Sequence, residues 1–549
     1  MLAAAFLLWC ASIVHAFPRL TRASSASSAG DIVDTGYAQY HGNRSFENTV
    51  AYLGIPYAEP PVGDRRFRAP LPLNTSHIKT ETFGQVVDAT QYPEFCVQGS
   101  TGAGDAGGAG TEDCLKLNIY APFGAKKGDN LPVLVYFHGG GYVYGNPANW
   151  PFDGWIDQSP NVVIVSVYYR LDSFGFLAVP EFDDTLIGDF NAGFQDQIQS
   201  LRWLQAYIDF FGGNPEKVTI NGQSAGGGSV ELHLVAKNQG EHLFSGAIVQ
   251  SAYRTPTPTP EQQQPLFTFY AENAGCGVGS VIVQLACLRN ASISALARAQ
   301  DAASTSGLAY NTFHPVVDGK IITDYPSSSI LRGQFANVPL IVGATSNETV
   351  LGGTNFTQTL QEAFPGLTSA DLEEFVKEYP LSEFDSTSQQ FQVATGESIL
   401  ICSREILGGA YAHATIAWTY RYNQPNPTSG SLAVGHAAEN WMMFNGINTG
   451  FNGTGTFTPM SPVEKAFAAE LIAYWLSFVR SGNPNTFKLD RSPDWEEYFI
   501  TGDNLKQRIV LQQPVNNSTT VSGSLIEREP AVESGRCSFV ATKIRHEQN

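Results

Sequence analysis

The chain has 549 residues, of which 43% are hydrophobic and 15% are charged, and this describes a globular protein with enough apolar material for a large core. Its 32 Lys and Arg are outnumbered by 51 Asp and Glu, which gives a formal net charge of −19 at pH 7. Nucleic acid and anionic membrane surfaces carry charge of the same sign, so we expect neither as a partner.

The first residues have the features of a secretory signal. Residues 2–14 are almost continuously apolar, and Val14-His15-Ala16 is a small-x-small cleavage pattern. We therefore expect a signal peptide over residues 1–16 and a secreted, extracellular protein. No other apolar run approaches the ~18 residues that a spanning helix needs, so stable membrane insertion is not expected. Residues 17–549 contain no long low-complexity linker and no repeat, which predicts a single domain.

The cysteine count agrees with an oxidising compartment. Cys10 leaves with the signal peptide, and the remaining six cysteines form an even set, which predicts disulfides but leaves their pairing open. We also expect N-linked glycans at several of the sequons. These sequons begin at Asn43, Asn74, Asn290, Asn347, Asn355, Asn452, Asn516 and Asn517.

The central part of the chain predicts an α/β fold. Residues 131–137 and 161–169 are near-continuous β-branched and aromatic runs, a pattern typical of strands buried on both faces of a parallel sheet. Residues 194–211 carry apolar side chains at steps of three and four, which predicts a helix that ends at Gly212. A strand follows from Val218, so the segment forms a βαβ unit. Further predicted strands cover residues 338–342 and 414–422. We expect a large, mostly parallel central sheet covered by helices on both faces.

The segment Gly222-Gln223-Ser224-Ala225-Gly226 lies where the strand from Val218 turns into a helix. This is the nucleophile-elbow pattern of the α/β-hydrolase fold, in which glycines on either side of the serine let strand and helix pass close together. The turn also places the Ala225 N–H at a helix N-terminus, where it can face negative charge. The pattern predicts acyl transfer through Ser224.

An acyl-transfer serine also needs donors for the oxyanion, a base and an orienting carboxylate. The segment 138–142, His-Gly-Gly-Gly-Tyr, directly follows a predicted strand and matches the oxyanion loop of this fold. The acid and the base should follow the serine in that order. His436 stands in a loop of small residues, and Glu348 follows the strand at 338–342. Asp318 is a rival for the acid, although an Asp-Gly pair more often marks a turn. No metal-ligand cluster or nucleotide motif is visible, so neither metal nor cofactor is expected.

These motifs resemble the type B carboxylesterase/lipase family, which includes cholinesterases, fungal lipases and the non-catalytic neuroligins. The resemblance extends over nearly the whole mature chain and suggests a secreted member of the fungal type. It is also carried by Leu53-Gly-Ile-Pro-Tyr-Ala58, Pro61-Val-Gly-Asp-Arg-Arg-Phe67, Glu112-Asp-Cys-Leu-Lys-Leu-Asn-Ile119, Asn191-Ala-Gly193, Asp196-Gln197, Phe211-Gly-Gly-Asn-Pro215 and Phe478-Val-Arg-Ser-Gly-Asn-Pro484.

The resemblance implies a role for each site residue. It makes Ser224 the nucleophile, Glu348 the acid and His436 the base, and it makes the N–H groups of Gly140, Gly141 and Ala225 the oxyanion hole, with Ser251 beside the acid. It also implies the disulfides Cys96–Cys114, Cys276–Cys287 and Cys402–Cys537. The chain departs from the family pattern at Gln223, Thr349 and Ala437, but none of these changes removes a group that the reaction uses. A glycan on Asn347 would crowd the site, so we expect this sequon to be unmodified.

The loop between Cys96 and Cys114 bears on the choice of substrate. In the fungal lipases of the family it carries an amphipathic lid helix, but here residues 97–113 include 6 Gly and no large apolar side chain beyond Val97. The loop also lacks the tryptophan with which cholinesterases bind a quaternary ammonium group. We therefore expect a carboxylesterase that acts on dissolved, short or medium acyl or aryl esters. The alternatives are a lipase with a different lid and, more remotely, a non-catalytic binding module.

Overall fold

The computed structural model describes residues 30–98, 110–237, 241–349, 351–449, 455–499 and 505–549. The predicted signal peptide lies outside the described residues, and so does most of the loop at 97–113 for which no lid helix is expected.

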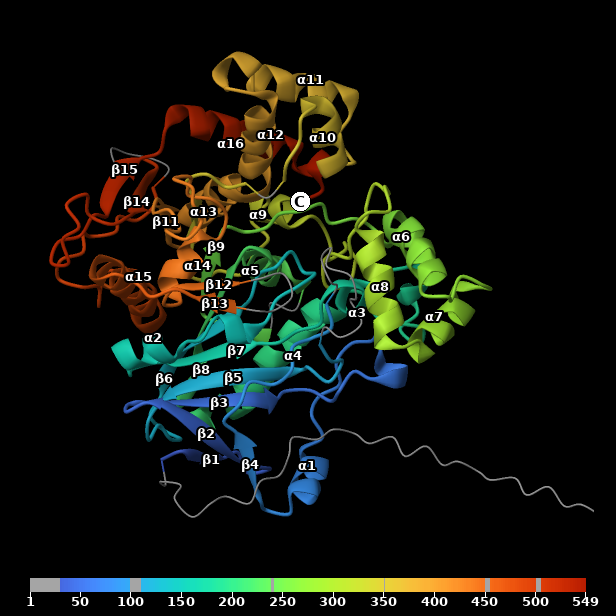
Figure 1. Cartoon of the computed structure of the whole chain (residues 1–549), viewed down its shortest axis with the longest axis vertical. Helices are drawn as coiled ribbons and strands as arrows, with labels where there is room; N and C mark the ends of the chain where they lie inside the picture. The colour runs from blue at the N-terminus through green and yellow to red at the C-terminus, as the bar shows by residue number, and fades with distance from the viewer. Residues whose placement is uncertain (1–29, 99–109, 238–240, 350, 450–454, 500–504) are drawn as a thin grey trace, which may run out of the picture.

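Across the described residues, a 13-stranded sheet forms the centre of the molecule (Figure 1). Its strands follow one another in the order β1 (Ile32–Asp34), β2 (Gln39–Phe46), β3 (Thr49–Pro56), β5 (Lys116–Pro122), β7 (Val163–Val167), β6 (Leu131–Phe137), β8 (Gly213–Gln223), β9 (Gly246–Gln250), β10 (Leu340–Thr345), β11 (Ala417–Tyr422), β14 (Gln507–Leu511) and β15 (Leu525–Arg528), while β4 (Val86–Ala89) pairs with β2. Pairing is parallel from β7 through β14 and between β2 and β4, and antiparallel elsewhere. The mostly parallel sheet predicted from the sequence is confirmed. A separate hairpin joins β12 (Ile447–Thr449) and β13 (Gly455–Phe457).

Helices cover both faces of this sheet. The α-helices among the described residues are α1 (Thr75–Thr82), α2 (Asp153–Gln158), α3 (Asp172–Phe176), α4 (Ala192–Tyr207), α5 (Ala225–Val235), α6 (Pro260–Asn273), α7 (Val281–Asn290), α8 (Ile293–Ala303), α9 (Pro326–Leu331), α10 (Phe356–Ala363), α11 (Ser369–Glu378), α12 (Thr387–Gly396), α13 (Cys402–Ala414), α14 (Ala438–Met443), α15 (Pro462–Ser481) and α16 (Ala531–Glu547), with a π-helix over Glu397–Ile401 before α13. Of these, α10, α11 and α12 pack with one another in a separate apolar cluster.

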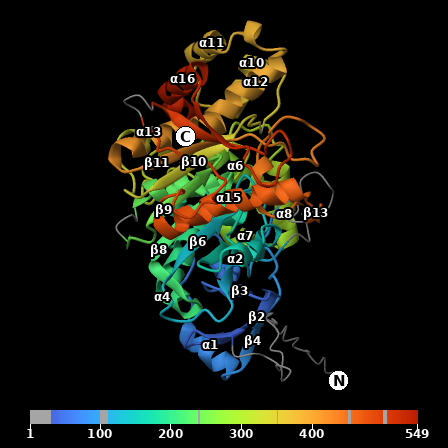
Figure 2. The ribbon, with the colours of Figure 1, turned by 90° about the vertical axis from the view of Figure 1, so that its left-hand side faces the viewer.

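Successive side chains of β6 show how the two faces are buried, because neighbouring residues of a strand point to opposite sides. Val133 and Val135 belong to one apolar cluster, which includes side chains of α4, α5, α6 and α8. Leu134 and Tyr136 belong to a second cluster, which includes side chains of α2, α14 and α15. Figure 2 shows α15 lying across its face of the sheet. The predicted two-sided cover is therefore confirmed.

The boundaries of the predicted elements shift by a few residues. The helix predicted at 194–211 is α4 followed by a 3₁₀ turn over Ile208–Phe211, and Gly212 ends it at φ 86°. The strand predicted at 414–422 begins only at Ala417, because α13 continues through Ala414.

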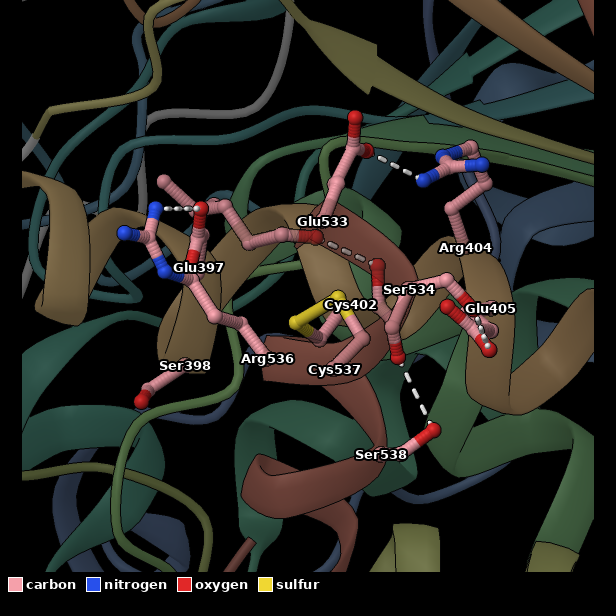
Figure 3. The surroundings of a disulfide bond; sticks show 12 residues. Glu397, Ser398, Cys402, Arg404, Glu405, Glu533, Ser534, Arg536, Cys537 and Ser538 are labelled. Carbon is pink, nitrogen blue, oxygen red and sulfur yellow. Dashed lines mark hydrogen bonds and ion pairs between the residues drawn. A yellow bond between two sulfur atoms is a disulfide. The ribbon is translucent and has the colours of Figure 1, made fainter. Parts of the chain in front are cut away.

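The structure joins the six cysteines in the pairs that the family resemblance implies. The Cα atoms lie 5.1 Å apart in Cys96–Cys114, 5.6 Å in Cys276–Cys287 and 5.0 Å in Cys402–Cys537. The last bond ties α16 to α13, beside the ion pair between Arg404 and Glu533 (Figure 3). In the described ranges, every helix is too short or too polar to cross a lipid bilayer.

Candidate active site

Ser224 occupies the sharp turn between β8 and α5. Its backbone is held at φ 60° and ψ −126°, a conformation that costs on the order of 1–3 kcal/mol for a residue with a side chain. The turn depends on the glycines around it, since a Cβ on Gly222 would lie 2.2 Å from the carbonyl oxygen of Gly226, and a Cβ on Gly226 would lie 2.0 Å from that of Phe137. The Ser224 N–H donates to the carbonyl of Gln250 at 2.9 Å, which fixes the turn to the end of β9.

The structure brings Ser224, His436 and Glu348 together in one hydrogen-bonded chain. His436 Nε2 lies 2.7 Å from Ser224 Oγ, and His436 Nδ1 lies 2.7 Å from Glu348 Oε2. The Glu348 side chain is fully buried, whereas 16% of the His436 side chain is exposed. A serine hydroxyl can therefore pass its proton to an imidazole whose far nitrogen is held by a carboxylate.

The electrostatics of this pair favour a charged carboxylate and a basic imidazole. Burial alone would raise the pKa of Glu348, but His436 and the hydrogen bonds around the carboxylate outweigh burial and lower it. Burial alone would lower the pKa of His436, but the nearby Glu348 carboxylate outweighs burial and raises it. The two groups thus stabilise each other's charged form.

Backbone hydrogen bonds hold the acid and the base in register. The Thr345 N–H at the end of β10 donates to Glu348 Oε1 at 2.9 Å. Asn347 and Val434 make two hydrogen bonds, one from the Asn347 N–H to the Val434 carbonyl and one from the Val434 N–H to Asn347 Oδ1, each 3.0 Å long. These two hydrogen bonds therefore hold the loop that carries His436 against the segment that carries Glu348. The sequence singled out Asn347 only as a sequon, because nothing local to it indicates this long-range bond.

Ser251 lies where the family resemblance puts it, beside the acid. It is fully buried just beyond β9, and its N–H donates to the carbonyl of Gly343 at 2.8 Å. Its hydroxyl lies close enough to Glu348 to help lower the pKa of that carboxyl, without making a well-aligned hydrogen bond.

The Gly-rich segment 138–142 packs against the serine turn. A Cβ on Gly139 would lie 2.8 Å from Ser224 Cβ, and Gly140 and Gly141 have φ angles of 115° and 61°, which favour glycine. Ala225 is the first residue of α5, so its N–H has no partner within the helix. Among the described residues, the N–H groups of Gly140, Gly141 and Ala225 have no hydrogen-bond acceptor.

Asp318, the alternative candidate for the acid, forms hydrogen bonds within its own turn and with Asn191. Its Oδ1 accepts the N–H groups of Lys320, Ile321 and Ile322 at 2.7, 2.8 and 3.0 Å, and its Oδ2 accepts Asn191 Nδ2 at 2.7 Å. The carboxylate closes a turn, as the Asp-Gly pair suggests, and it has no contact with His436.

Glu439 is a buried carboxyl near the site that the sequence did not single out. It lies in the first turn of α14 with 2% of its surface exposed, and neither carboxyl oxygen has a partner among the described residues. Burial, and after it the charge of Glu348, raises the pKa of Glu439 to about 7. Gln223, which stands where the family commonly has Glu, accepts a hydrogen bond from Asn440 at 3.2 Å through its Oε1.

A strained serine at a strand-to-helix turn, bonded to a histidine that is bonded in turn to a buried carboxylate, defines a serine hydrolase of the α/β-hydrolase fold. Across the described ranges, no group of three or more His, Cys, Asp or Glu is arranged to hold a metal ion.

Comparison with known proteins gives the family. Residues 29–524 match the Carboxylesterase family, so the chain belongs to this family and is a carboxylic ester hydrolase. It is 30% identical over 500 residues to the para-nitrobenzyl esterase of Bacillus subtilis (strain 168), an alignment that covers 88% of this chain and 95% of that one. It is 29% identical over 502 residues to the acetylcholinesterase of Danio rerio, covering 80% of this chain and 77% of that one. The crystal structure of Aspergillus niger EstA matches with a TM-score of 0.81 at 28% identity, covering 95% of this chain and 99% of that one.

Proposed function

We propose that this ester hydrolase acts through Ser224 as nucleophile, His436 as base and Glu348 as orienting acid. The observation that carries the proposal is the pair of 2.7 Å hydrogen bonds that link the three side chains in the order serine, histidine, carboxylate. Of the two candidate acids, only Glu348 is free to hold the imidazole, since Asp318 is engaged with backbone amides of its own turn.

The reaction follows from these roles. As Ser224 Oγ attacks the ester carbonyl, its proton passes to His436 Nε2, and the N–H groups of Gly140, Gly141 and Ala225 donate to the oxyanion. The tetrahedral intermediate then expels the alcohol, which takes the proton from His436 and leaves an acyl-enzyme. Water attacks this ester with His436 again as the base, and the carboxylic acid leaves.

The substrates we propose are dissolved esters with short or medium acyl chains or aryl groups. The segment 97–113 is too rich in glycine to form a lid helix, and it has no tryptophan to bind a quaternary ammonium group. The name of the Bacillus subtilis relative refers to a nitrobenzyl ester, and its alignment covers almost all of that protein. A lipase with a different lid is the second candidate, since the family also contains lipases.

We further propose that the chain is secreted, that residues 17–549 form one domain, and that several sequons carry N-linked glycans. These proposals rest on the apolar residues 2–14, on the Val14-His15-Ala16 cleavage pattern and on six cysteines joined in three disulfides.

The test of the nucleophile is Ser224→Ala, assayed with a p-nitrophenyl ester and with a fluorophosphonate probe. We expect kcat to fall by about 10⁴- to 10⁶-fold and the probe to lose its site, because only binding and oxyanion contributions remain. Ser245→Ala is the matched control, because Ser245 precedes β9 at the opposite end of the strands from Ser224, and its hydroxyl donates to the Val218 carbonyl at 3.3 Å. Retention of a tenth of the wild-type activity by Ser224→Ala would contradict the proposal.

A further inference from the structure

The loop that carries His436 is long, and its middle part is exposed. It runs from the end of β11 at Tyr422 to the start of α14 at Ala438, and residues 427–433 are all exposed. Val434, two positions before His436, is the first buried residue after this stretch, with 4% of its surface exposed. The position of the imidazole therefore depends on how Val434 is held.

Toward its end, the exposed stretch forms hydrogen bonds with its own residues. At its start, Thr428 forms hydrogen bonds of 2.9 and 3.2 Å with Asn448 of β12. Further along, the Ala433 N–H donates to Ser431 Oγ at 3.0 Å. Among the hydrogen bonds of the described residues, the next one that reaches a distant segment is that of Val434.

The turn that leads from β10 to Glu348 holds the first end of this loop. The Ser346 N–H donates to the carbonyl of Tyr422 at 3.0 Å, and the Ser346 hydroxyl donates to Asn423 Oδ1 at 2.7 Å. The point at which the loop leaves β11 is therefore fixed to the residue two positions before the acid.

Asn347, the next residue, holds the second end of the loop. Its backbone N–H donates to the Val434 carbonyl at 3.0 Å, and its side-chain Oδ1 accepts the Val434 N–H at 3.0 Å. Glu348 then holds His436 itself at 2.7 Å. Residues 346, 347 and 348 thus hold the start of the loop, its end and the imidazole in turn.

The side-chain oxygen of Asn347 is the acceptor for a buried N–H group. Without this oxygen the Val434 N–H would be buried with no acceptor, which is unfavourable. The loop would then move so that the N–H reaches water or another acceptor. His436 lies two residues further on, so this movement also displaces its imidazole from the 2.7 Å bonds with Ser224 and Glu348.

We propose that Asn347 is a positioning residue, whose side-chain oxygen keeps the His436 imidazole within hydrogen-bond distance of Ser224 and Glu348. This inference rests on the proposed function, in which His436 is the base. A base acts in proton transfer and not in binding of the ester, so Asn347 affects kcat and leaves KM nearly unchanged. A displacement of about 1 Å can cost on the order of 10²-fold in rate.

The first comparison is between Asn347→Ala and Asn347→Asp, assayed with p-nitrophenyl butyrate. Ala has no acceptor, and we expect kcat to fall about tenfold with KM within twofold, because the backbone N–H of residue 347 still holds the Val434 carbonyl. Asp has a carboxylate oxygen where Asn has its amide oxygen, so Asn347→Asp should keep roughly half or more of the wild-type kcat at the alkaline plateau. Neither variant can carry a glycan at this residue, so the difference between them reports the oxygen.

The pH profile of kcat/KM separates positioning from a loss of stability. Burial lowers the pKa of His436, but the charge of Glu348, and after it that of Glu439, outweighs burial and raises it. An imidazole displaced from Glu348 loses part of this effect, so the acid limb of Asn347→Ala should move to lower pH. Asn347→Asp adds a further negative charge near the imidazole, so its acid limb should move to higher pH.

Two control variants test the other properties of Asn347. Asn485→Ala is the matched control, because the Asn485 side chain also exchanges hydrogen bonds with a buried backbone, that of Trp495 at 2.7 and 2.9 Å, and these bonds involve no triad residue. Thr349→Val removes the sequon and leaves the Asn347 side chain in place. Both variants should keep the kcat and the acid limb of the wild type.

Three results would overturn the role of Asn347: unchanged kcat in Asn347→Ala, an equal loss of kcat in Asn485→Ala, or an equal loss in Thr349→Val, which would assign the effect to a glycan. If Asn347→Ala does not fold, Asn347→Gln, which moves the amide oxygen by one methylene, takes its place with the same outcomes.

Fluorophosphonate labelling separates this failure from that of the proposed function. A wild-type protein labelled away from Ser224 contradicts the nucleophile. Ser224 labelled at an undiminished rate in Asn347→Ala contradicts only the positioning role.

Discussion

Replacing Glu348 by Gln is a severe test of the active-site geometry, because the two side chains have nearly the same shape. Glu348 accepts two hydrogen bonds through different oxygens, one from His436 Nδ1 at 2.7 Å and one from the Thr345 N–H at 2.9 Å. Gln has one carbonyl oxygen and one NH₂ group, so it can accept only one of them well. Either the NH₂ group faces Thr345 and weakens the end of β10, or it faces Nδ1 and forces the tautomer whose proton sits on Nε2.

The second arrangement removes the base from the serine, and both arrangements remove the negative charge that raises the pKa of His436. A wrong tautomer costs on the order of 10⁴ in kcat in serine hydrolases, which corresponds to ~5 kcal/mol of transition-state stabilisation. We expect Glu348→Gln to lose about 10³- to 10⁴-fold in kcat for p-nitrophenyl butyrate, with little change in KM. The acid limb of the residual kcat/KM profile should move to lower pH, because burial then acts on His436 without its counter-charge.

Asp318→Asn is the matched control, since Asn can still accept the backbone amides of its turn through Oδ1. Its kcat should stay within about threefold of wild type, because the hydrogen bonds of Asp318 to Asn191 and to its own turn involve no triad residue. A Glu348→Gln variant with more than a tenth of the wild-type kcat would refute the reasoning, and so would a collapse of kcat in Asp318→Asn.

Three further predictions follow from the same structure. For the wild type, kcat/KM should rise with pH and its acid limb should lie above the ordinary imidazole range, because only neutral His436 can act as base and Glu348 raises its pKa; a limb below that range would contradict the pair. Non-reducing peptide mapping should recover a peptide that links Cys402 to Cys537, and a link from Cys402 to any other cysteine would show the pairing wrong. With tributyrin, the rate should saturate below the solubility limit, whereas a sharp jump at the appearance of emulsion would favour the lipase alternative.

Much of the fold could be predicted from the sequence because the spacing of hydrophobic residues within a short segment indicates whether it forms a strand or a helix. The run at 131–137 alternates between two buried faces and is strand β6 as predicted, and the elbow around Ser224 is recognisable because sterics admit only glycine at two of its positions. The residues at which predicted helices and strands begin and end could not be predicted as well. The apolar pattern at 414–422 could not show where α13 ends and β11 begins, since alanine and threonine suit either element at a junction.

Contacts between distant segments could not be predicted in this way. The choice of His436 among the histidines rests on the small residues around it and on the family resemblance, whereas nothing near Asn347 in the sequence indicates its hydrogen bonds with Val434. The sequence also gives no sign that Glu439 is unusual. Among the described residues its carboxyl group is buried without a hydrogen-bond partner, and the packing of α14 against the sheet creates this burial. A contact between distant segments has no characteristic spacing of residues in the sequence, so a motif search does not find it.

The sheet explains how groups so far apart in the sequence meet within hydrogen-bond distance. Strands β8, β9, β10 and β11 are neighbours and parallel, so their carboxyl ends lie along one edge. Ser224 follows β8, Glu348 follows β10, and the loop that carries His436 leaves from β11 and is bonded back to Asn347. The end of β9 connects the serine turn to the strand that precedes the acid. The Gln250 carbonyl accepts the Ser224 N–H, and the Ser251 N–H donates to the carbonyl of Gly343 in β10. The distances within the triad are thus set by backbone bonds of the sheet, so a change that shifts the register of β9 should disturb the serine and the acid together.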